Sequence, residues 1–184
     1  MSETSPCDVK IQNVVAVASL DQEIDILAIM EAFENADYQP NKFPGLVFKL
    51  KRPKTTTLIF RTGKMVCTGA RSEKEAKSAV GKVVRELNKE GFKIRSPEID
   101  VVNIVGTADF GGEVDLESMA DILDDIMYEP EMFPGLIYRM KYPKVVILLF
   151  RSGKIVLTGA NREEQVHEAV EKMRSILVEN GLLY

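Results

Sequence analysis

Basic side chains gather in two long stretches of the sequence that contain no carboxylate, which we call the basic windows. Residues 38–72 hold eight lysines and arginines, residues 132–162 hold six, and neither stretch contains Asp or Glu. The basic residues are Lys42, Lys49, Lys51, Arg52, Lys54, Arg61, Lys64 and Arg71 in the first window, and Arg139, Lys141, Lys144, Arg151, Lys154 and Arg162 in the second. Ammonium and guanidinium groups grouped in this way are suited to binding phosphate or other anions.

The net charge of the whole chain conceals this segregation. It is −4 at pH 7, with a pI of about 5.2, and such values alone argue against nucleic-acid binding. Outside the windows, however, ten basic residues stand against all twenty-eight acidic ones. The sequence therefore predicts one cationic and one anionic surface, and the simpler alternative is that each is only a solvated face.

Residue types that carry out catalysis or bind metals are scarce. The single histidine, His167, is predicted on the polar side of a helix and has no Cys or Asp at ligand spacing. Cys7 and Cys67 stand sixty positions apart, and we interpret both as unpaired thiols in a reducing compartment. The chain has no Gly-rich phosphate loop and no nucleophile elbow. We therefore predict no enzyme, no metal site and no cofactor.

Length and composition describe a globular protein. The chain has 184 residues, of which 45% are hydrophobic and 28% are charged, enough for a core without a metal or disulfide. Its longest apolar runs, such as residues 145–150, are far shorter than a membrane span, and its start lacks the pattern of a secretion signal. We expect no membrane association and a cytoplasmic location.

The two basic windows arise from an internal repeat with an offset of ninety residues. Residues 38–46, YQPNKFPGL, align with residues 128–136, YEPEMFPGL. At the same offset FRTGK aligns with FRSGK, TGA at residues 68–70 with TGA at residues 158–160, and NVV with NIV. Two copies of one unit predict an intramolecular pseudo-two-fold. We place a tail at residues 1–8, repeat 1 at 9–95 and repeat 2 at 96–184.

Each repeat is predicted to contain a strand, a short helix, several strands and a long helix. Apolar residues recur at helical spacing in residues 73–90 and in the equivalent segment of repeat 2. Ser72 with Glu75, and Asn161 with Glu164, have the form of N-terminal capping boxes, and Gly91 and Gly181 stand where C-terminal caps belong. The earlier helices are predicted over residues 21–36 and 113–127.

The segments between the helices read as antiparallel strands with two apolar faces. Strands are predicted over residues 46–52, 55–61 and 64–70 and over their equivalents ninety residues on, and Thr62-Gly63 and Ser152-Gly153 signal tight hairpins. The runs 14–17 and 145–150 do not alternate apolar with polar residues. We predict an α+β fold: a saddle of about ten antiparallel strands, with four helices on its convex face and an apolar concave face bordered by cations.

Soluble proteins rarely leave such a face without a partner. A protein partner would match the apolar surface but would not explain the cations. A DNA minor groove matches both, because its sugar edges are comparatively apolar, its rims are phosphate and its A·T floor displays only acceptors.

The repeated motifs resemble the core of the TATA-box-binding protein family. The resemblance rests on the paired FPGL segments, the paired F-x-x-G-K hairpins and the paired V-x-T-G-A strands, and it extends from about Val9 to the C-terminus. It implies a general transcription initiation factor that binds an A·T-rich promoter in the minor groove and kinks it. The short N-terminal region and the symmetry of the repeats suggest the archaeal type, with a location on the nucleoid.

The resemblance implies a role for each repeated residue. Phe43, Phe60, Phe133 and Phe150 would be the wedges that open base steps. Asn13, Asn103, Thr68 and Thr158 would donate hydrogen bonds to base edges, and Val15, Val66, Val105 and Val156 would leave no room for the guanine amino group. Lys49, Lys51, Lys64, Arg139, Lys141 and Lys154 would contact phosphates. The roles of Arg61 and Arg151 stay open.

The repeats differ at one loop, where Glu129, Glu131 and Met132 of repeat 2 replace Gln39, Asn41 and Lys42 of repeat 1. In the family this acidic loop contacts transcription factor B, which recruits RNA polymerase, and the resemblance implies the same here. Self-association is a further expectation for the DNA-free protein. The alternative to DNA binding is a non-catalytic module that binds a protein or a small ligand on the apolar sheet.

Overall fold

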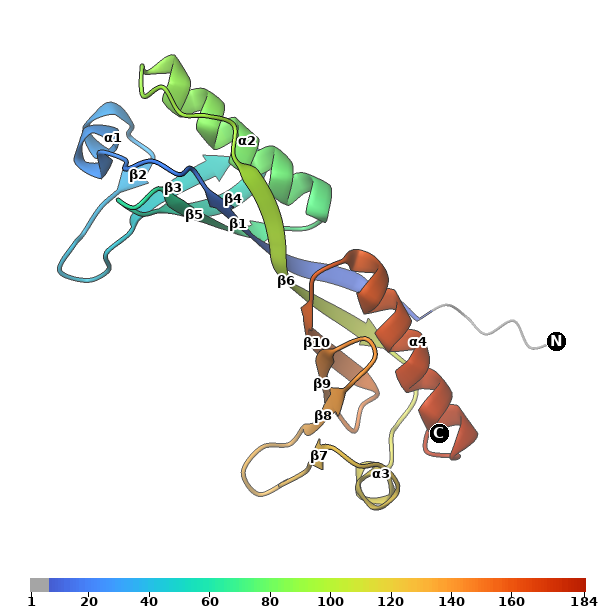
Figure 1. Cartoon of the computed structure of the whole chain (residues 1–184). Helices are drawn as coiled ribbons and strands as arrows, with labels where there is room; N and C mark the ends of the chain where they lie inside the picture. The colour runs from blue at the N-terminus through green and yellow to red at the C-terminus, as the bar shows by residue number, and fades with distance from the viewer. Residues whose placement is uncertain (1–6) are drawn as a thin grey trace. The chain divides into compact units, whose positions relative to one another are not determined.

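The structure is a computed structural model that describes residues 7–184, so most of the predicted tail at 1–8 lies outside the described residues. The elements of the first half are β1 (Lys10–Ser19), α1 (Ile26–Ala32), β2 (Ala36–Asp37), β3 (Leu46–Lys51), β4 (Lys54–Ile59), β5 (Lys64–Ala70) and α2 (Glu73–Lys89). The second half contains β6 (Glu98–Asp109), α3 (Leu116–Ile122), β7 (Ile126–Met127), β8 (Leu136–Met140), β9 (Val145–Leu149), β10 (Lys154–Ala160) and α4 (Glu163–Glu179) (Figure 1).

The ten strands have the order β2-β3-β4-β5-β1-β6-β10-β9-β8-β7, and the paired strands of each half run antiparallel. The order β2-β3-β4-β5-β1 of the first half thus recurs in reverse in the second half, as β6-β10-β9-β8-β7. The prediction of about ten antiparallel strands with four helices, built from two similar repeats, is confirmed within the described residues.

Contacts divide the chain into two compact units, which we call the N unit (Asn13–Val102) and the C unit (residues 7–12 with Asn103–Tyr184). Strands β1 and β6 each contribute residues to both units. The division therefore separates Asn13 from the residues that precede it on the same strand, and Asn103 likewise. Each unit holds one of the two Asn residues at an end of its segment.

The core of the N unit lies between its strands and α2 (Figure 1). Leu46 and Phe48 of β3, Ile59 of β4 and Val80 of α2 are fully buried in one cluster. Phe33 meets Phe48 edge to face, with ring centroids 5.2 Å apart. Burying such side chains stabilises the fold by about 1.5 to 3 kcal/mol each, so this cluster fixes which face of the strands points to the helix.

The core of the C unit repeats this arrangement with different side chains. Leu136, Ile147 and Leu157 from three strands are buried with Val170 of α4. The equivalents of Ile147 and Leu157 in the N unit are Thr57 and Cys67, which are also buried and are paired across β4 and β5. The N unit thus has a more polar core at the same depth.

The ends of the long helices agree with the sequence in three of four cases. Ser72 accepts a hydrogen bond from the Glu75 backbone N–H at 2.9 Å, as predicted, and Gly91 and Gly181 have φ of 90° and 64°. The capping box predicted for Asn161 and Glu164 is wrong. The N-cap of α4 is Arg162, which makes no side-chain cap bond, and the Asn161 N–H instead donates to Gln165.

The two short helices are shorter than predicted, seven residues each instead of spans of about fifteen. Before α1, the backbone N–H groups of Leu20 and Ile24 donate to carbonyls of the β4–β5 hairpin, so this segment cannot be helical. Asp25 and Asp115 then cap the helices through the N–H groups of Ala28 and Ser118. The hydrogen bonds to Ser118 also lower the pKa of Asp115.

The predicted strands between the helices match to within two residues, and the segment 64–70 matches at both ends. Both hairpins are present: Phe60 N–H donates to the Lys64 carbonyl, and Phe150 N–H donates to the Lys154 carbonyl. Within residues 7–184, no helix combines the length and the apolar character that a membrane span needs.

Candidate nucleic-acid interface

Each unit has a row of half-buried apolar side chains on the strand face opposite its buried core. In the N unit these side chains alternate with fully buried ones along β1, β3, β4 and β5, and they are Val15, Val17, Val47, Leu58 and Val66. The C unit has Val105, Ile137, Leu148 and Val156 at the equivalent positions; it also has Val146, where the N unit has Thr56. We call these rows the apolar strand faces. Their Val members include the four that the sequence singled out.

An aromatic pair lies at one end of the N-unit face. Phe43, 39% exposed, meets the half-buried Phe60 edge to face, with ring centroids 5.8 Å apart and planes at 66°. The pair packs over Gly45, where an added Cβ would lie 2.7 Å from the Phe43 ring and 3.0 Å from the Phe60 ring. Edge-to-face pairs are a favourable aromatic geometry, and here they keep both rings at the surface.

The C unit has the same pair. Phe133 is 40% exposed and meets Phe150 with centroids 6.0 Å apart and planes at 68°. Gly135 lies beneath the two rings, with a hypothetical Cβ at 2.7 and 2.9 Å from them. The structure therefore brings the four predicted wedge residues together in two matched pairs, one in each unit.

The strand register explains how residues far apart in the sequence form these pairs. Leu46 pairs with Ile59 across β3 and β4, so Gly45 and Phe60 follow as neighbours just beyond the ladder. Phe43 lies two residues before Gly45, and its backbone N–H donates to the Gln39 carbonyl at 3.0 Å. The sequence F-P-G-L thus places one ring before a small residue that the second ring can cover.

The Asn of the N unit lies on the apolar strand face and is hydrogen-bonded to β5. Its Oδ1 accepts from the Gly69 backbone N–H at 2.7 Å, and the Thr68 hydroxyl lies 3.3 Å from its Nδ2 and 3.4 Å from its Oδ1. Here β5 has an irregular register against β1, because Val14 pairs with Ala70 and Ala16 with Cys67. The extra residue forms a bulge that aims the Gly69 N–H at Asn13.

The C unit repeats this contact. The Gly159 N–H donates to Oδ1 of Asn103 at 2.7 Å, and the Thr158 hydroxyl donates to the same oxygen at 3.3 Å. The register of β10 against β6 shifts between Leu157 and Ala160, as in the N unit. Each predicted Asn and Thr pair is therefore in contact within one unit.

The predicted phosphate-binding residues are all exposed, but their surroundings differ. Lys49 and Lys51 stand on β3, and Lys64 and Lys154 begin β5 and β10. Lys141 forms an ion pair with Asp125 at 3.5 Å. Among the six, Lys141 is the one whose charge is already partly compensated by a described carboxylate, an exposed pair of modest strength.

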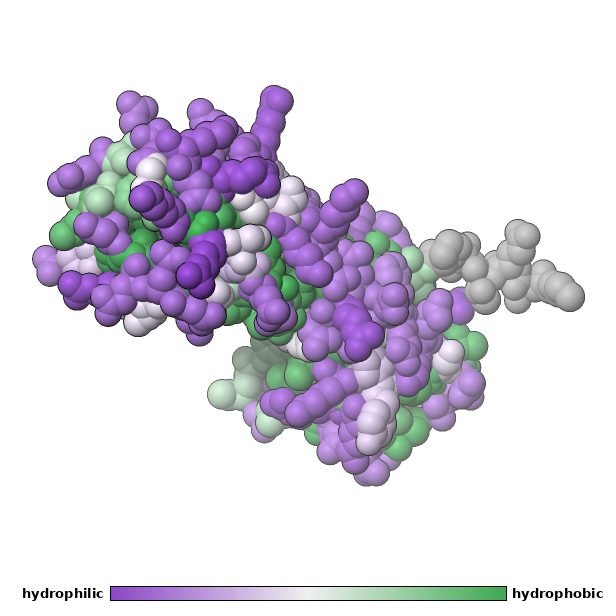
Figure 2. Space-filling view, turned by 45° about the horizontal axis from the view of Figure 1, so that its top comes forward, coloured by the Kyte–Doolittle hydropathy of each residue, from purple (hydrophilic) through white to green (hydrophobic). Residues whose placement is uncertain are grey.

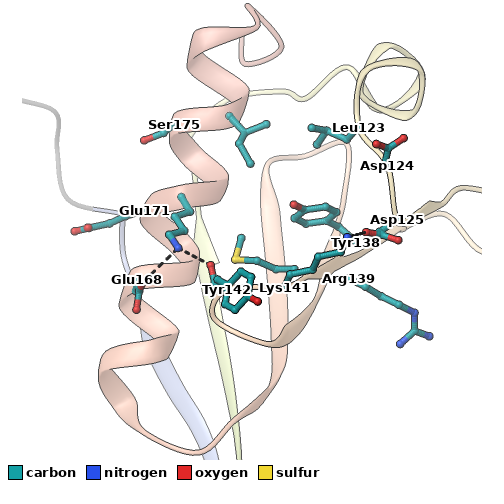
Figure 3. A pocket seen from close by; sticks show the side chains of 13 residues that line it. Leu123, Asp124, Asp125, Tyr138, Arg139, Lys141, Tyr142, Glu168, Glu171 and Ser175 are labelled. Atoms are coloured by element: carbon teal, nitrogen blue, oxygen red, sulfur yellow. Dashed lines mark hydrogen bonds and ion pairs between the residues drawn. The ribbon is translucent and has the colours of Figure 1, made fainter.

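A groove with a volume of about 830 Å³ lies between α4 and β8 of the C unit (Figure 3). Lys172 of α4 forms an ion pair with Glu168 at 3.3 Å and donates to the Tyr142 carbonyl. Arg139 and Lys141 lie on its rim, and Figure 3 shows the Arg139 side chain directed away from the ion pair of Lys172. The groove contains none of the predicted base-contacting residues.

The two hairpin arginines, whose roles the sequence left open, have different surroundings. Arg151 donates to Glu117 at 2.7 Å, and its hydrogen bond to Tyr128 together with the charge of Glu117 raises the pKa of the guanidinium. In the N unit the position of Glu117 is taken by Leu27, which is 56% exposed beside Arg61 in a smaller groove. The repeats are thus chemically unequal at this point.

The loop that distinguishes the repeats is fully displayed to solvent. Glu129 and Glu131 are exposed, and Met132 is 82% exposed. The Met132 N–H donates to the Glu129 carbonyl at 2.9 Å, which holds the turn. The loop of repeat 2 therefore presents two carboxylates and an exposed methionine to solvent, where the loop of repeat 1 presents Gln39, Asn41 and Lys42.

Sequence reasoning did not identify the glycines as part of the site. Gly45 and Gly135 lie under the rings, and the backbone N–H groups of Gly69 and Gly159 donate to the Asn side chains. The signal was present, since both pairs recur at the ninety-residue offset.

The surface in Figure 2 is mainly hydrophilic, with hydrophobic patches between the polar side chains.

Comparison with known proteins gives a consistent result. A family model described as Transcription factor TFIID (or TATA-binding protein, TBP) matches residues 8–90 and again residues 98–180. A TATA-box-binding protein of Pyrobaculum calidifontis is 48% identical over 185 residues, covering 100% of this chain and 92% of that protein. One of Pyrodictium occultum is 51% identical over 164 residues, covering 89% and 82% of the two chains.

A solved structure agrees with these sequence matches. The protein described as Methanococcus jannaschii TBP superimposes with a TM-score of 0.83 at 45% identity, covering 93% of this chain and 98% of that chain. The relatives named here come from archaea, as the sequence predicted.

Proposed function

Because the chain belongs to the TATA-box-binding protein family of general transcription initiation factors, we propose that it binds an A·T-rich promoter element in the minor groove. The observation that carries the proposal is the matched site in each unit: an apolar strand face with a half-exposed pair of Phe rings at one end and an Asn side chain within it. A DNA minor groove offers a partner for each feature, because apolar rings can enter between base steps and the floor of an A·T pair offers acceptors to the Asn amides.

The Phe pairs act as wedges that separate neighbouring base pairs. Full burial of a Phe contributes about 1.5 to 3 kcal/mol, and because these rings are already half-buried, a pair gains only about that amount on insertion. Unstacking a base step costs a few kcal/mol. The wedges therefore nearly balance the cost of the kink, and the net affinity comes from the rest of the apolar strand faces and from phosphate contacts.

The Asn and Val residues select A·T pairs. The minor-groove floor of an A·T pair offers only acceptors, which match the Asn13 and Asn103 amide donors. Val15, Val66, Val105 and Val156 pack against the sugar and base edges, where they offer no acceptor to the guanine amino group of a G·C pair. Thr68 and Thr158 stand at the same positions of the two units and complete the polar part of the site.

The exposed cations hold the two phosphate backbones. Lys49, Lys51, Lys64, Arg139, Lys141 and Lys154 each release counterions on binding, so the affinity falls with salt despite the acidic pI. The acidic loop of the C unit, with Glu129, Glu131 and Met132, is left for transcription factor B, which brings RNA polymerase to the promoter. This loop has no acidic equivalent in the N unit, so it also gives the assembled complex a direction.

A fluorescence titration with an A·T-rich and a G·C-rich duplex at two salt concentrations tests the proposal. We expect tighter binding of the A·T-rich duplex, with affinity for both falling steeply as salt rises. Binding of neither duplex below micromolar concentration at low salt would refute it. Equal affinity for both sequences would indicate a basic surface without minor-groove recognition.

A further inference from the structure

We infer that the backbone N–H groups of Gly69 and Gly159 fix the orientation of the two Asn amides, so that the NH₂ end is the one left available for DNA. The inference deepens the proposed function and rests on it. Under this inference Gly69 and Gly159 are positioning residues for A·T selection, although neither carries a side chain.

The hydrogen-bond partners decide which end of each Asn amide is held. The oxygen and nitrogen of an Asn side chain are similar in size, so the assignment must come from the hydrogen-bond partners. A backbone N–H can only donate, and it lies 2.7 Å from the near atom of the amide in both units. That atom must be Oδ1, and the NH₂ group then occupies the other side.

The glycine N–H groups hold each Asn amide more tightly than the threonine hydroxyls do. The Gly69 and Gly159 contacts are 2.7 Å long, whereas the Thr68 and Thr158 contacts are 3.3 to 3.4 Å. Hydrogen bonds weaken as they lengthen, so the glycine N–H is the main anchor. The Thr158 hydroxyl donates its single hydrogen to Oδ1 of Asn103, and Nδ2 of Asn13 donates one of its two hydrogens to the Thr68 hydroxyl, so each amide NH₂ still has a hydrogen to offer.

The backbone conformation at both bulges favours glycine. Gly69 and Gly159 have φ of 96° and 99°, a conformation that side chains with a Cβ rarely adopt. A Cβ would find no contact closer than 3.4 Å at Gly69 or 3.6 Å at Gly159. Backbone conformation, and not crowding, therefore requires glycine, and the conformation is what aims the N–H across to the neighbouring strand.

The consequence for recognition is a donor prepared before DNA arrives. A flipped amide would set its oxygen against adenine N3 or thymine O2, and both of these are acceptors. A fixed NH₂ also opposes the amino group of a G·C pair, donor against donor. Preorganisation of this kind raises affinity because no ordering of the side chain remains to be done on binding.

The geometry can be tested in the free protein by NMR. With ¹⁵N and ¹³C labelling, we expect a scalar coupling across the hydrogen bond between the Gly159 nitrogen and the Asn103 side-chain carbonyl carbon, and slow exchange of the Gly159 amide hydrogen. The Gly69 and Asn13 pair should behave alike. Absence of both couplings, with fast exchange of both amides, would overturn the inference whatever the protein does with DNA.

The effect on selection can be tested by deleting one hydrogen. A semisynthetic chain with an ester in place of the amide at Gly159 loses the N–H without changing the side chains. We expect the ratio of A·T-rich to G·C-rich duplex affinity to fall at least fivefold. An ester at Gly181 is the matched control. The Gly181 N–H donates to the Val178 carbonyl at 3.1 Å and does not belong to the site, so its loss should leave the affinity ratio unchanged.

Asn103→Asp separates the two ends of the side chain. One carboxylate oxygen still accepts from Gly159, while the other replaces the NH₂ donor, so the affinity for the A·T-rich duplex should fall at least tenfold. An ester at Gly159 that leaves the ratio unchanged would overturn the inference while the proposed function stands. If the unmodified protein shows no A·T preference at all, the proposed function fails, and the NMR couplings still report whether the amide is held.

Discussion

Phe133 and Phe150 stand edge to face with their ring centres 6.0 Å apart, although seventeen positions separate them in the chain. Both rings rest on Gly135, and the same relationship recurs between Phe43 and Phe60 over Gly45. Because the two rings pack on each other at the protein surface, both can move into a bound partner without exposing the hydrophobic core. This separation between surface aromatics and core aromatics leads to the first prediction.

Phe150→Ala should weaken DNA bending strongly while lowering the free energy of unfolding by only about 1 to 3 kcal/mol, since the half-buried ring loses about half of a full Phe burial of about 1.5 to 3 kcal/mol together with an aromatic pairing of about 0.5 to 1.5 kcal/mol. Energy transfer between dyes at the ends of an A·T-rich duplex measures the bend, and thermal unfolding measures the stability. Phe48→Ala is the control, because Phe48 is fully buried and its loss should cost about 3 to 5 kcal/mol. A comparable loss of stability for both variants would assign Phe150 to the core.

Gly135→Ala should reduce bending without removing any aromatic ring. The new Cβ would lie within 3 Å of both Phe133 and Phe150, so at least one ring must move. Gly81→Ala in α2 serves as the control, since its Cβ meets only the end of the Arg85 side chain at 3.4 Å. We expect that control to gain about 1 kcal/mol of stability and to bend DNA normally. Unimpaired bending by the Gly135 variant would show that the ring geometry is not critical.

Replacing a phosphate-binding lysine should change the salt dependence of binding more than its sequence preference. For Lys64→Ala, we expect the slope of log affinity against log salt to become shallower by about 0.9. Lys82→Ala is the control and should leave the slope unchanged, because Lys82 belongs to α2 and its ammonium donates to the Arg52 carbonyl at 2.6 Å. An identical slope for wild-type and Lys64 variant proteins would remove Lys64 from the interface.

Charge reversal in the acidic loop should separate DNA binding from partner binding. Glu129→Arg with Glu131→Arg should abolish capture of transcription factor B on a promoter duplex, while the affinity for the duplex alone stays the same or rises. The equivalent loop of the N unit offers the control: Gln39→Arg with Asn41→Arg should leave the capture unchanged. A gel-shift assay with and without the partner distinguishes these cases. Undiminished capture by the first variant would place the contact elsewhere.

The two cysteines should differ sharply in reactivity. Cys67 is fully buried, so a reagent cannot reach its sulfur, and burial also raises the pKa of the thiol, so less of the reactive thiolate forms. Cys7 is only partly buried, although burial raises its pKa as well. Alkylation followed by mass spectrometry should modify Cys7 first and Cys67 only as denaturant opens the N unit. Modification of both at equal rates in native buffer would show that the N unit opens readily.

Much of the fold could be predicted because its signals are local and occur twice. The long helix over Glu73–Lys89 and the strand Lys64–Ala70 follow from apolar spacing and from Gly positions that the repeat confirms. The short helices were overestimated because the hydrogen bonds that hold residues 20–24 come from the hairpin at Gly63, a contact that spacing alone does not reveal.

The candidate site was predictable in its residue types but not in its contacts. Phe, Asn and Thr at matched positions were visible in the sequence, and the four Phe residues do form two pairs. The bulges at Gly69 and Gly159 could not be predicted, because a register shift depends on both strands at once. The Asn161 cap failed for a local reason: the helix begins one residue later, with Arg162 as its N-cap, and the Asn161 N–H donates to Gln165 instead of the expected Glu164.

Thr57 marks a difference in core polarity that should give the two units different thermal stabilities. Its buried hydroxyl has no hydrogen-bond partner of ordinary geometry among the described residues, with the Cys67 thiol beside it, whereas Ile147 fills the equivalent place with carbon. An unsatisfied buried hydroxyl costs about 1 to 3 kcal/mol. On warming, the N unit should therefore unfold at a lower temperature than the C unit. The calorimetric unfolding curve should show a low-temperature shoulder, and Thr57→Val should remove it.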